Sequence, residues 1–210
     1  MRRFSQSLRL EGRCTTHKIS QSGKGRMAME FNYEKFKDLV HYICHMADRD
    51  ELGATKLNKI LWFSDMVTYI NQGKSLTGSV YVKRQYGPVP KDILQALDDL
   101  STEEKMIVRD IPYFGNTKRE YISLTEPDIN RFEAFEISLV ANIMHHICHH
   151  HSAESISDAT HDIIWKLADM GEEIPYCAIY GAQLGEITEE DIQWGKDSIA
   201  KNEAAYGRAI

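Results

Sequence analysis

The segment from residue 55 to residue 72 predicts a helix whose apolar positions cover nearly its whole circumference. One stripe at helical spacing contains Leu57, Ile60, Leu61, Ser64 and Val67. A second stripe on the far side contains Trp62, Phe63, Met66, Tyr69 and Ile70. Only a narrow strip through Asn58, Asp65 and Gln72 is polar. A helix that is apolar on both sides must be covered on both sides, so we predict a buried central helix with other helices packed around it.

The sequence on either side of residues 55–72 supports this arrangement. Thr55 is expected to cap the start of the central helix, and Gly73 is expected to end it. Residues 32–49 repeat apolar side chains at positions i, i+3, i+4 and i+7, which is typical of an amphipathic helix. A short hinge at residues 50–54 would then let these two helices pack antiparallel.

Residues 87–124 predict a turn, a helix and a hairpin in succession. The run Gly87-Pro88-Val89-Pro90 is expected to form a stiff turn, with Pro90 in the first turn of a helix that continues to about Leu100. Residues 106–111 and 118–124 predict the two strands of a β-hairpin. The helix and hairpin at residues 90–124 are therefore winged-helix-like in order, while residues 79–85 favour neither helix nor strand.

The remaining part of the chain predicts more helices. Thr125 followed by Asp128 is a helix-start signal for a long helix that ends in a His-rich patch at residues 145–151. Ser152 is expected to open a shorter helix, and further helices are expected over residues 160–170 and 188–206. The fold class expected is mainly α with a small β-hairpin, a compact helical domain around the central helix.

Composition limits the class of protein. The chain has 210 residues, of which 42% are hydrophobic and 27% charged, as in a globular protein with a core. It contains no apolar run of the roughly 18 residues that span a membrane and no secretory signal, so no membrane partner is expected. Four cysteines without a CxxC motif indicate reduced thiols and a cytoplasmic location. A net charge of −6 disfavours nucleic acid as a partner.

The ends of the chain differ from its middle. Residues 1–28 contain seven Lys and Arg and no apolar period, which predicts a flexible basic tail. Met27 or Met29 is an alternative start, in which case this tail is not part of the protein. We expect residues 29–180 to form the main domain and residues 181–210 a C-terminal helical extension.

Two groups of residues raise the question of metal binding or catalysis. His145, Cys148 and His149 share a helical face and are weak candidate ligands for zinc, but their spacing matches no standard zinc site. Histidines at a helix end are also explained by the helix dipole. Asp65 and His161 are the best candidates for catalytic groups, yet the sequence contains no phosphate-binding loop, GxSxG or HExxH motif. We expect no cofactor and no catalytic residue.

A DNA-binding regulator is the alternative that the winged-helix order suggests. Its helix should be basic, because contacts to phosphates supply much of the affinity for DNA. The predicted helix instead contains Asp92, Asp98 and Asp99 against Lys91 alone. This charge pattern makes DNA binding the less favoured interpretation.

Three ordered blocks of the sequence resemble a known family. The first is Lys56-Leu57-Asn58-Lys59-Ile60-Leu61-Trp62-Phe63-Ser64-Asp65, and about twenty residues later comes Tyr86-Gly87-Pro88-Val89-Pro90. Downstream lie Ser157-Asp158-Ala159-Thr160-His161, Trp165 and the run from Gly171 to Tyr176. Together these blocks are similar to the Panacea domain of SocA-like antitoxins.

The resemblance implies a non-enzymatic antitoxin that neutralises a cognate protein toxin, encoded beside it, by direct contact. It also implies two further roles, as an adaptor that delivers the toxin to an AAA+ protease and as a component of phage defence. By the resemblance, Lys59, Asp65 and His161 are the polar motif residues and would form a buried network or line a groove. Four others are expected to hold the fold: Tyr86, Gly87, Pro88 and Trp165.

Overall fold

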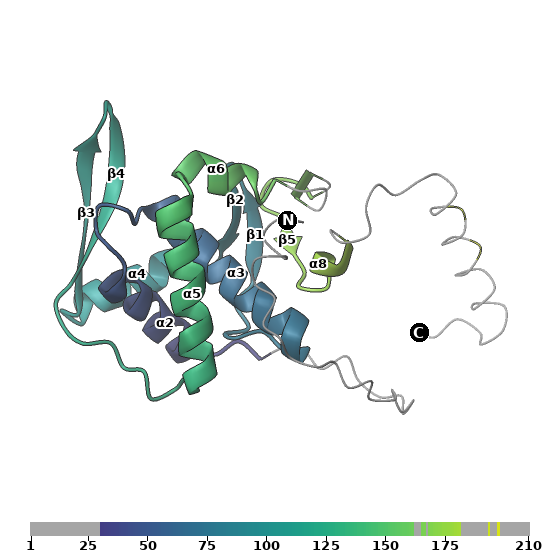
Figure 1. Ribbon diagram of the computed structural model, residues 1–210, viewed down its shortest axis with the longest axis horizontal. Coiled ribbons are helices and arrows are strands. Elements are labelled where there is room, and N and C mark those ends of the chain that lie inside the picture. The colour runs from purple at the N-terminus through teal and green to yellow at the C-terminus, as the bar shows by residue number, and fades with distance from the viewer. Residues whose placement is uncertain (1–29, 162–164, 167, 182–192, 194–196, 198–210) are drawn as a thin grey trace.

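The computed structural model describes residues 30–161, 165–166, 168–181, 193 and 197. Helix α3 (Ala54–Gln72) lies at the centre of this part of the chain (Figure 1). Helices α2 (Tyr33–Met46), α5 (Ala134–His150) and α6 (Ala153–Asp158) contact it from different sides. The prediction of a buried central helix is therefore confirmed: Leu57, Ile60 and Leu61 are fully buried, and the exposure of its large apolar side chains increases only toward the C-terminal end of the helix, where Ile70 is 38% exposed.

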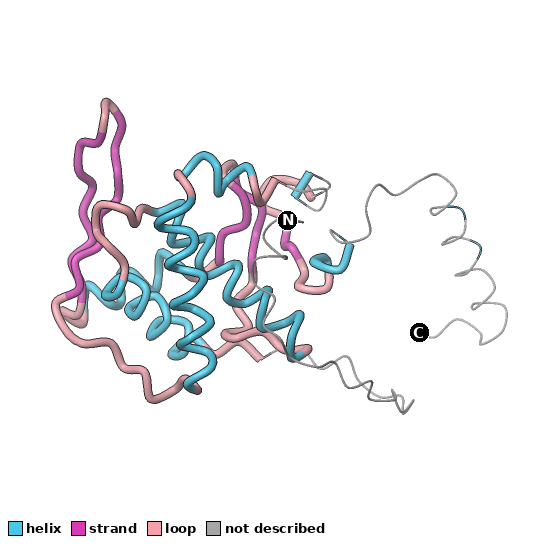
Figure 2. The backbone as a smooth tube through the Cα atoms, viewed as in Figure 1, coloured by secondary structure: helices cyan, strands magenta, loops and turns pink. Residues whose placement is uncertain are grey.

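Two small β structures flank the helices (Figure 2). Strands β1 (Tyr81–Arg84), β2 (Gly87–Pro90) and β5 (Glu173–Ile174) form an antiparallel sheet in the order β2-β1-β5. Strands β3 (Met106–Tyr113) and β4 (Asn116–Ser123) form the predicted hairpin, which extends beyond the helical body in Figure 1. Helix α4 (Ile93–Thr102) precedes the hairpin, and the short helix α8 (Ala178–Gly181) follows β5.

The prediction of a turn at residues 87–90 and a helix from Pro90 is wrong. Residues 87–90 are strand β2, which pairs with β1, and helix α4 begins only at Ile93. The two prolines are tolerated because β2 is an edge strand of the sheet, where a missing backbone N–H breaks no ladder. The sheet as a whole was not predicted, since only one hairpin was expected.

The predicted start of the long helix is also wrong. Helix α5 begins at Ala134, after a capping box in which the side chains of Glu133 and Glu136 each accept a hydrogen bond from the backbone N–H of the other. Ile129 lies in the preceding loop with 46% of its surface exposed. Similarly, the residue before α3 is Gly53 rather than the expected cap Thr55. At the start of α5 a different local signal, the Glu133–Glu136 capping box, takes the place of the expected one, and at the start of α3 a glycine takes the N-cap position.

Other predictions concern helix ends and the C-terminal region. Gly73 ends α3 in the left-handed conformation, and Ser152 caps α6, as expected. Of the helix expected over residues 160–170, residues 165–166 are helical, but residues 160–161 and 168–170 form turns, a bend and irregular structure, so that part of the prediction is wrong; residues 162–164 and 167 lie outside the described residues. The tail at residues 1–28 and most of the helix expected at 188–206 lie outside them too.

The described part of the chain is about half helical, with a small antiparallel sheet and a separate hairpin, so its mixed α and β content agrees only roughly with the predicted mainly-α class. A helix and a hairpin do follow one another in residues 90–124, but this order alone does not define a winged helix. No helix within the described residues is both long and apolar enough to cross a membrane.

Candidate functional site

The three sequence blocks meet where helix α3, the β1–β2 turn and the segment after α6 come together. The Ser157 hydroxyl donates to the backbone carbonyl of Tyr86 across 3.1 Å. The indole Nε1 of Trp165 donates to the carbonyl of Arg84, also across 3.1 Å. Both bonds end on backbone carbonyls, one at the end of β1 and one in the β1–β2 turn, so the C-terminal block holds this segment through its backbone.

Gly87 is required in this turn for two reasons. Its φ of +103° lies in a region that other residues rarely adopt. A Cβ at this position would also overlap the Nζ atom of Lys59 and approach the Thr160 hydroxyl to 2.5 Å. The absence of a side chain at Gly87 therefore leaves the space that the end of Lys59 occupies.

Lys59 is an unusual lysine. Its side chain is 1% exposed, and its Nζ atom has no hydrogen-bond partner within the described part of the chain. Burial disfavours the charged ammonium and lowers the pKa of Lys59 to about 7. Lys59 is thus a buried amine that can lose its charge near neutral pH, packed against the motif glycine.

His161 and Trp165 cover the neighbouring surface. Their rings stack with centroids 3.9 Å apart, and the Nζ atom of Lys83 lies 4.1 Å from the centre of the Trp165 ring. The Lys83 ammonium also donates to the carbonyl of Ala168. Burial and the nearby Lys59 both lower the pKa of His161, which favours the neutral imidazole that stacks on the indole.

Asp65 belongs to a separate network. It is fully buried and accepts hydrogen bonds from the Thr77 backbone N–H (2.7 Å), the Thr77 hydroxyl (2.8 Å) and the Tyr81 hydroxyl (2.7 Å). Burial raises the pKa of Asp65 to about 6, although these donors act in the opposite direction. The carboxylate therefore joins α3 to the loop before β1.

The three polar motif residues are thus not brought together into one cluster. Lys59 lies near His161, whose pKa it influences, whereas the hydrogen bonds of Asp65 go to Thr77 and Tyr81. Lys59 and Asp65 are buried and His161 is half-buried. Nothing in the sequence indicated that Thr77 and Tyr81 are the partners of Asp65, since both lie outside the three motif blocks.

The motif residues expected to hold the fold differ in their surroundings. Pro88 and Trp165 line a small cavity of about 10 Å³, together with Trp62 and Thr160. Gly87 and Pro88 are buried. The Tyr86 side chain, in contrast, is 60% exposed, and only its backbone carbonyl enters the network.

The surroundings of the site limit its chemistry. A cavity of about 10 Å³ holds roughly one water molecule. The Ser157 hydroxyl lies 3.4 Å from the Nε2 atom of His161, but it is buried and donates to a carbonyl. This geometry favours packing and hydrogen bonding over a reactive serine.

A larger groove of about 280 Å³ lies elsewhere, between the start of α3, strands β1 and β2, α4 and β4. Its charged lining residues are all basic: Arg84, Lys91 and Arg119. The remaining lining is mostly apolar, with Leu94 and Leu97 of α4 on one side.

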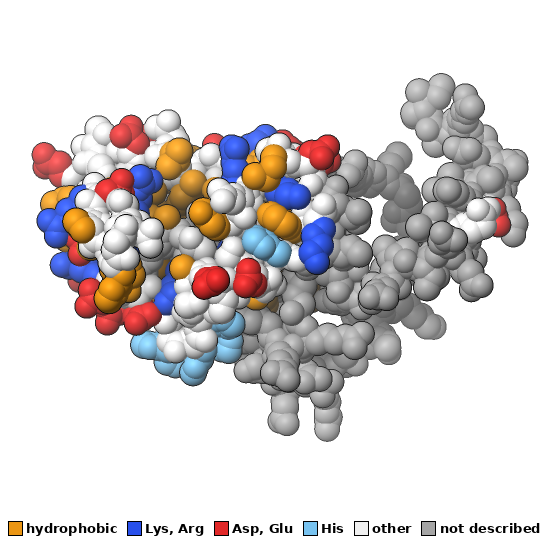
Figure 3. All heavy atoms as spheres, turned by 90° about the horizontal axis from the view of Figure 1, so that it is seen from above, with side chains coloured by type: hydrophobic (Ala, Val, Ile, Leu, Met, Phe, Trp, Pro, Cys, Tyr) orange, Lys and Arg blue, Asp and Glu red, His pale blue; other side chains and the backbone are white. Residues whose placement is uncertain are grey.

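The His-rich patch does not form a metal centre. His145 and His149 are exposed, and the centroids of their rings lie 4.5 Å apart. Figure 3 shows His side chains gathered at one edge of the molecule. Cys148 on the same helix is buried, and burial raises the pKa of its thiol. Across the described ranges, no three His, Cys, Asp or Glu side chains converge in a way that could hold a metal ion.

Comparison with known families identifies the class of protein. The profile of the antitoxin SocA-like, Panacea domain family matches residues 57–166, more than half of the chain. The protein belongs to this antitoxin-like family, as the resemblance of its motifs predicted. The match begins within α3 and includes Lys59, Gly87, Ser157 and Trp165. Neither a curated protein nor a solved structure matches the chain significantly.

Proposed function

We propose that this protein is an antitoxin that neutralises a cognate protein toxin by binding it directly, without catalysing a reaction. The family match over residues 57–166 carries the proposal. It spans all the residues that join α3, the β1–β2 turn and the segment after α6. We take residues 29–180 as the antitoxin domain, with the limits expected from the sequence.

The positions of the motif residues support a binding role. Lys59, Asp65 and Ser157 are each less than 5% exposed, and the carboxylate and hydroxyl are used in internal hydrogen bonds. The small cavity lined by Pro88 and Trp165 has room for about one water molecule rather than a substrate. Such residues are suited to hold a rigid scaffold, and a rigid scaffold loses less conformational entropy when its surface binds a partner.

Co-expression with the adjacent gene tests the proposal. The polypeptide encoded beside this chain should arrest growth when it is expressed alone, and growth should recover when both are expressed. The two chains should also co-purify as a complex of defined stoichiometry. A neighbouring product that is harmless alone and does not co-purify would reject the antitoxin role.

The mode of neutralisation is a separate part of the proposal. Direct occlusion predicts that the two purified proteins suffice to block the toxin's activity. Delivery to an AAA+ protease predicts instead that the toxin remains active in the purified mixture and is degraded faster when the protease and ATP are added. Measuring toxin activity and toxin half-life in the same reconstituted mixture distinguishes the two modes.

The alternative of a DNA-binding regulator receives little support from the charges. In the hairpin, Arg109 pairs with Glu120 at 2.6 Å and Arg119 pairs with Asp110 at 3.0 Å. These ion pairs partly neutralise the two arginines. Phosphate binding needs positive charge that is not already paired. A gel-shift experiment at low salt with the DNA upstream of the gene should therefore show no retention.

A further inference from the structure

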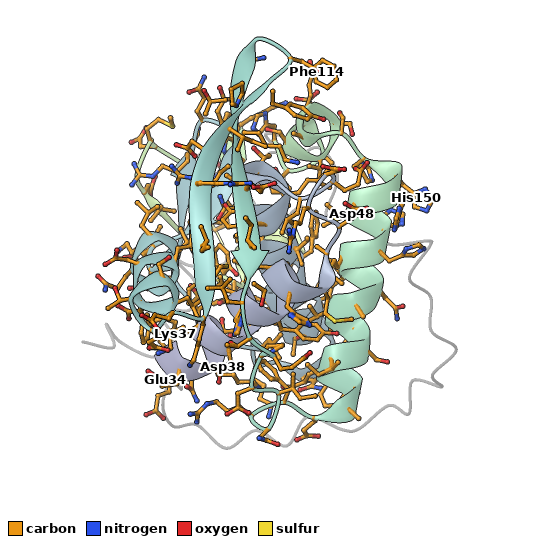
Figure 4. All side chains as sticks on the ribbon, turned by 90° about the vertical axis from the view of Figure 1, so that its left-hand side faces the viewer. Glu34, Lys37, Asp38, Asp48, Phe114 and His150 are labelled. Atoms are coloured by element: carbon orange, nitrogen blue, oxygen red, sulfur yellow. The ribbon has the colours of Figure 1, made fainter. Side chains whose placement is uncertain are left out.

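The tip of the hairpin β3–β4 is uncharged and aromatic. Residues 112–117 have the sequence PYFGNT, which contains no ionisable group apart from the Tyr113 phenol. Phe114 is 91% exposed and Tyr113 is 45% exposed, and their rings contact edge to face with centroids 4.8 Å apart. Figure 4 shows Phe114 at the end of the hairpin, at the top of the view. A large apolar ring is thus held in solvent at the most protruding point of the domain.

The backbone at this tip adds a second observation. Phe114 has a φ of +45° and Gly115 a φ of +80°, so both central residues of the two-residue turn are left-handed. Such turns favour Asn-Gly or Gly-Gly, because the Cβ of a bulky residue is crowded by the backbone at positive φ. Phenylalanine is therefore a poor choice for folding at position 114, and backbone strain that folding does not explain is characteristic of functional sites.

The hairpin presents this ring in a fixed position. Two cross-strand ion pairs, Arg109–Glu120 and Asp110–Arg119, stabilise the strands below the tip. The Lys118 ammonium donates to the carbonyls of Arg49 and Asp50, each across 2.7 Å, and so ties β4 to the loop before α3. The hairpin is therefore an anchored arm rather than an unattached loop.

The chemistry of the tip indicates the kind of surface that it fits. An uncharged tip offers nothing to phosphates, whose recognition depends on Lys and Arg. Exposed aromatic side chains that fill a pocket are the residues that most often dominate the energy of a protein–protein interface. We propose that Phe114, supported by Tyr113, is the anchor that inserts into an apolar pocket on the protein toxin. This inference rests on the proposed antitoxin function.

The variant Phe114→Asn separates binding from folding. Asparagine is favoured in a left-handed turn position, so the variant should have an unchanged or higher thermal midpoint. Its affinity for the purified product of the adjacent gene should fall by about 30-fold or more, the loss expected for an interface hot spot. The variant Phe114→Trp keeps an aromatic anchor and should retain most of the affinity.

The matched control is Phe135→Asn. Phe135 is 43% exposed and lies at the start of α5, at the end of the domain away from the hairpin tip in Figure 1. The same substitution there should change the affinity by less than about threefold. Calorimetric titration of one partner preparation with the wild type and the three variants (Phe114→Asn, Phe114→Trp and Phe135→Asn) gives the four affinities to be compared.

The outcomes distinguish this inference from the proposed function. Equal affinity of the wild type and Phe114→Asn for the partner would overturn the anchor. The anchor is also overturned if the only effect of Phe114→Asn is to disrupt a dimer of this chain. Sedimentation would detect that change, and Phe114 would then be seated in the groove of a second copy. The proposed anchor would likewise be overturned if Phe114→Asn kept its affinity for the partner and lost only its binding to neutral phosphatidylcholine vesicles. If the wild type does not bind the partner at all, the proposed antitoxin function fails first, and the anchor fails with it.

Discussion

The end of the Lys59 side chain occupies the space that any side chain at position 87 would need. A Cβ on residue 87 would overlap the Lys59 Nζ atom, and the φ of +103° at Gly87 is itself unfavourable for other residues. These two residues lie in different sequence blocks, on α3 and on β2. Their contact explains in physical terms why a lysine and a glycine 28 positions apart belong to one motif.

We expect Gly87→Ala to destabilise the domain by about 2–5 kcal/mol, because the strain of a positive φ and the overlap with Lys59 add together. Gly171→Ala is the matched control. Its φ is +86° and a Cβ there meets nothing within 4 Å, so it should lose only the cost of the backbone strain, about 1–2 kcal/mol. Urea unfolding of both variants measures the difference, and equal losses would contradict the overlap.

Shortening Lys59 should partly rescue that substitution. In the double variant Gly87→Ala with Lys59→Ala, the overlap with Lys59 is removed, while the backbone strain and the 2.5 Å approach to the Thr160 hydroxyl remain. We therefore expect a coupling free energy of about 1–3 kcal/mol in a double-mutant cycle. Additive effects of the two substitutions would show that the residues do not compete for space.

The buried Lys59 amine makes the free energy of unfolding depend on pH between about pH 7 and pH 10. The folded pKa of about 7 lies below the ordinary value of 10.5, so between these values the unfolded chain binds a proton that the folded chain does not. The free energy of unfolding should consequently rise between pH 7 and pH 10, by up to about 1.4 kcal/mol per pH unit. Urea unfolding across this range should show the rise, and Lys59→Met should abolish it.

A second buried lysine provides the control. Lys37 pairs with Glu103 at 2.6 Å, and this hydrogen bond raises the pKa of Lys37 above its usual value. Lys37→Met should therefore lower stability at pH 7, by about 1–2 kcal/mol, and leave the rise between pH 7 and pH 10 in place. Lys59→Met should instead raise stability at pH 7. A large loss from Lys59→Met would mean that the amine has a partner.

Asp65 should dominate the pH dependence of stability between about pH 4 and pH 6. Its folded pKa of about 6 lies above the ordinary 3.8, so the folded chain holds this proton more tightly than the unfolded chain does. The Asp65 contribution to stability is thus greatest below pH 4 and decreases as pH rises to about 6. Carbon-13 NMR of the Asp65 carboxyl should give a midpoint near 6, and a midpoint below 4 would contradict the effect of burial.

The donors around Asp65 can be tested one at a time. Tyr81→Phe removes a single hydrogen bond to the carboxylate and should cost about 1–3 kcal/mol. It should also raise the pKa of Asp65, since the donor that stabilised the ionised form is lost. A titration midpoint that does not move would show that the tyrosine hydroxyl does not face the carboxylate.

The His-rich patch should not respond to metal removal. His145 and His149 are exposed whereas the Cys148 side chain is buried, and three side chains fall short of the four ligands that structural zinc normally takes. Adding EDTA to the untagged protein should change the thermal midpoint by less than about 2 °C. A larger decrease that disappears in His145→Ala with His149→Ala would indicate a metal site.

Local patterns in the sequence predicted several elements correctly because those elements depend on near neighbours. The apolar repeat of residues 55–72 gives α3, Gly73 and Ser152 act as helix caps, and alternating residues give the hairpin. The start of α5 was placed too early, since Thr125 and Asp128 have the helix-start pattern but the Glu133–Glu136 capping box forms instead. The chain thus contains two local helix-start signals, and the structure uses the later one.

The candidate site was only partly predictable. The motif blocks identified Lys59, Asp65 and His161 as a set, but not that Asp65 bonds to Thr77 and Tyr81 while Lys59 packs against Gly87. Strand β2 was missed because its two prolines are typical of a turn, and only pairing with β1 at a sheet edge makes them compatible with a strand.

The sequence by itself determined the buried central helix, the hairpin and the membership of the antitoxin-like family, and it determined the fold class only in part, because the three-stranded sheet was not expected. These follow from periodicity and from ordered motifs, which are properties of the chain before it folds. Only the tertiary structure decided that a buried lysine lies against a motif glycine and that Phe114 projects from an anchored hairpin. Burial and contact between distant residues depend on how the elements pack, because a residue's environment is set by segments that local sequence does not specify.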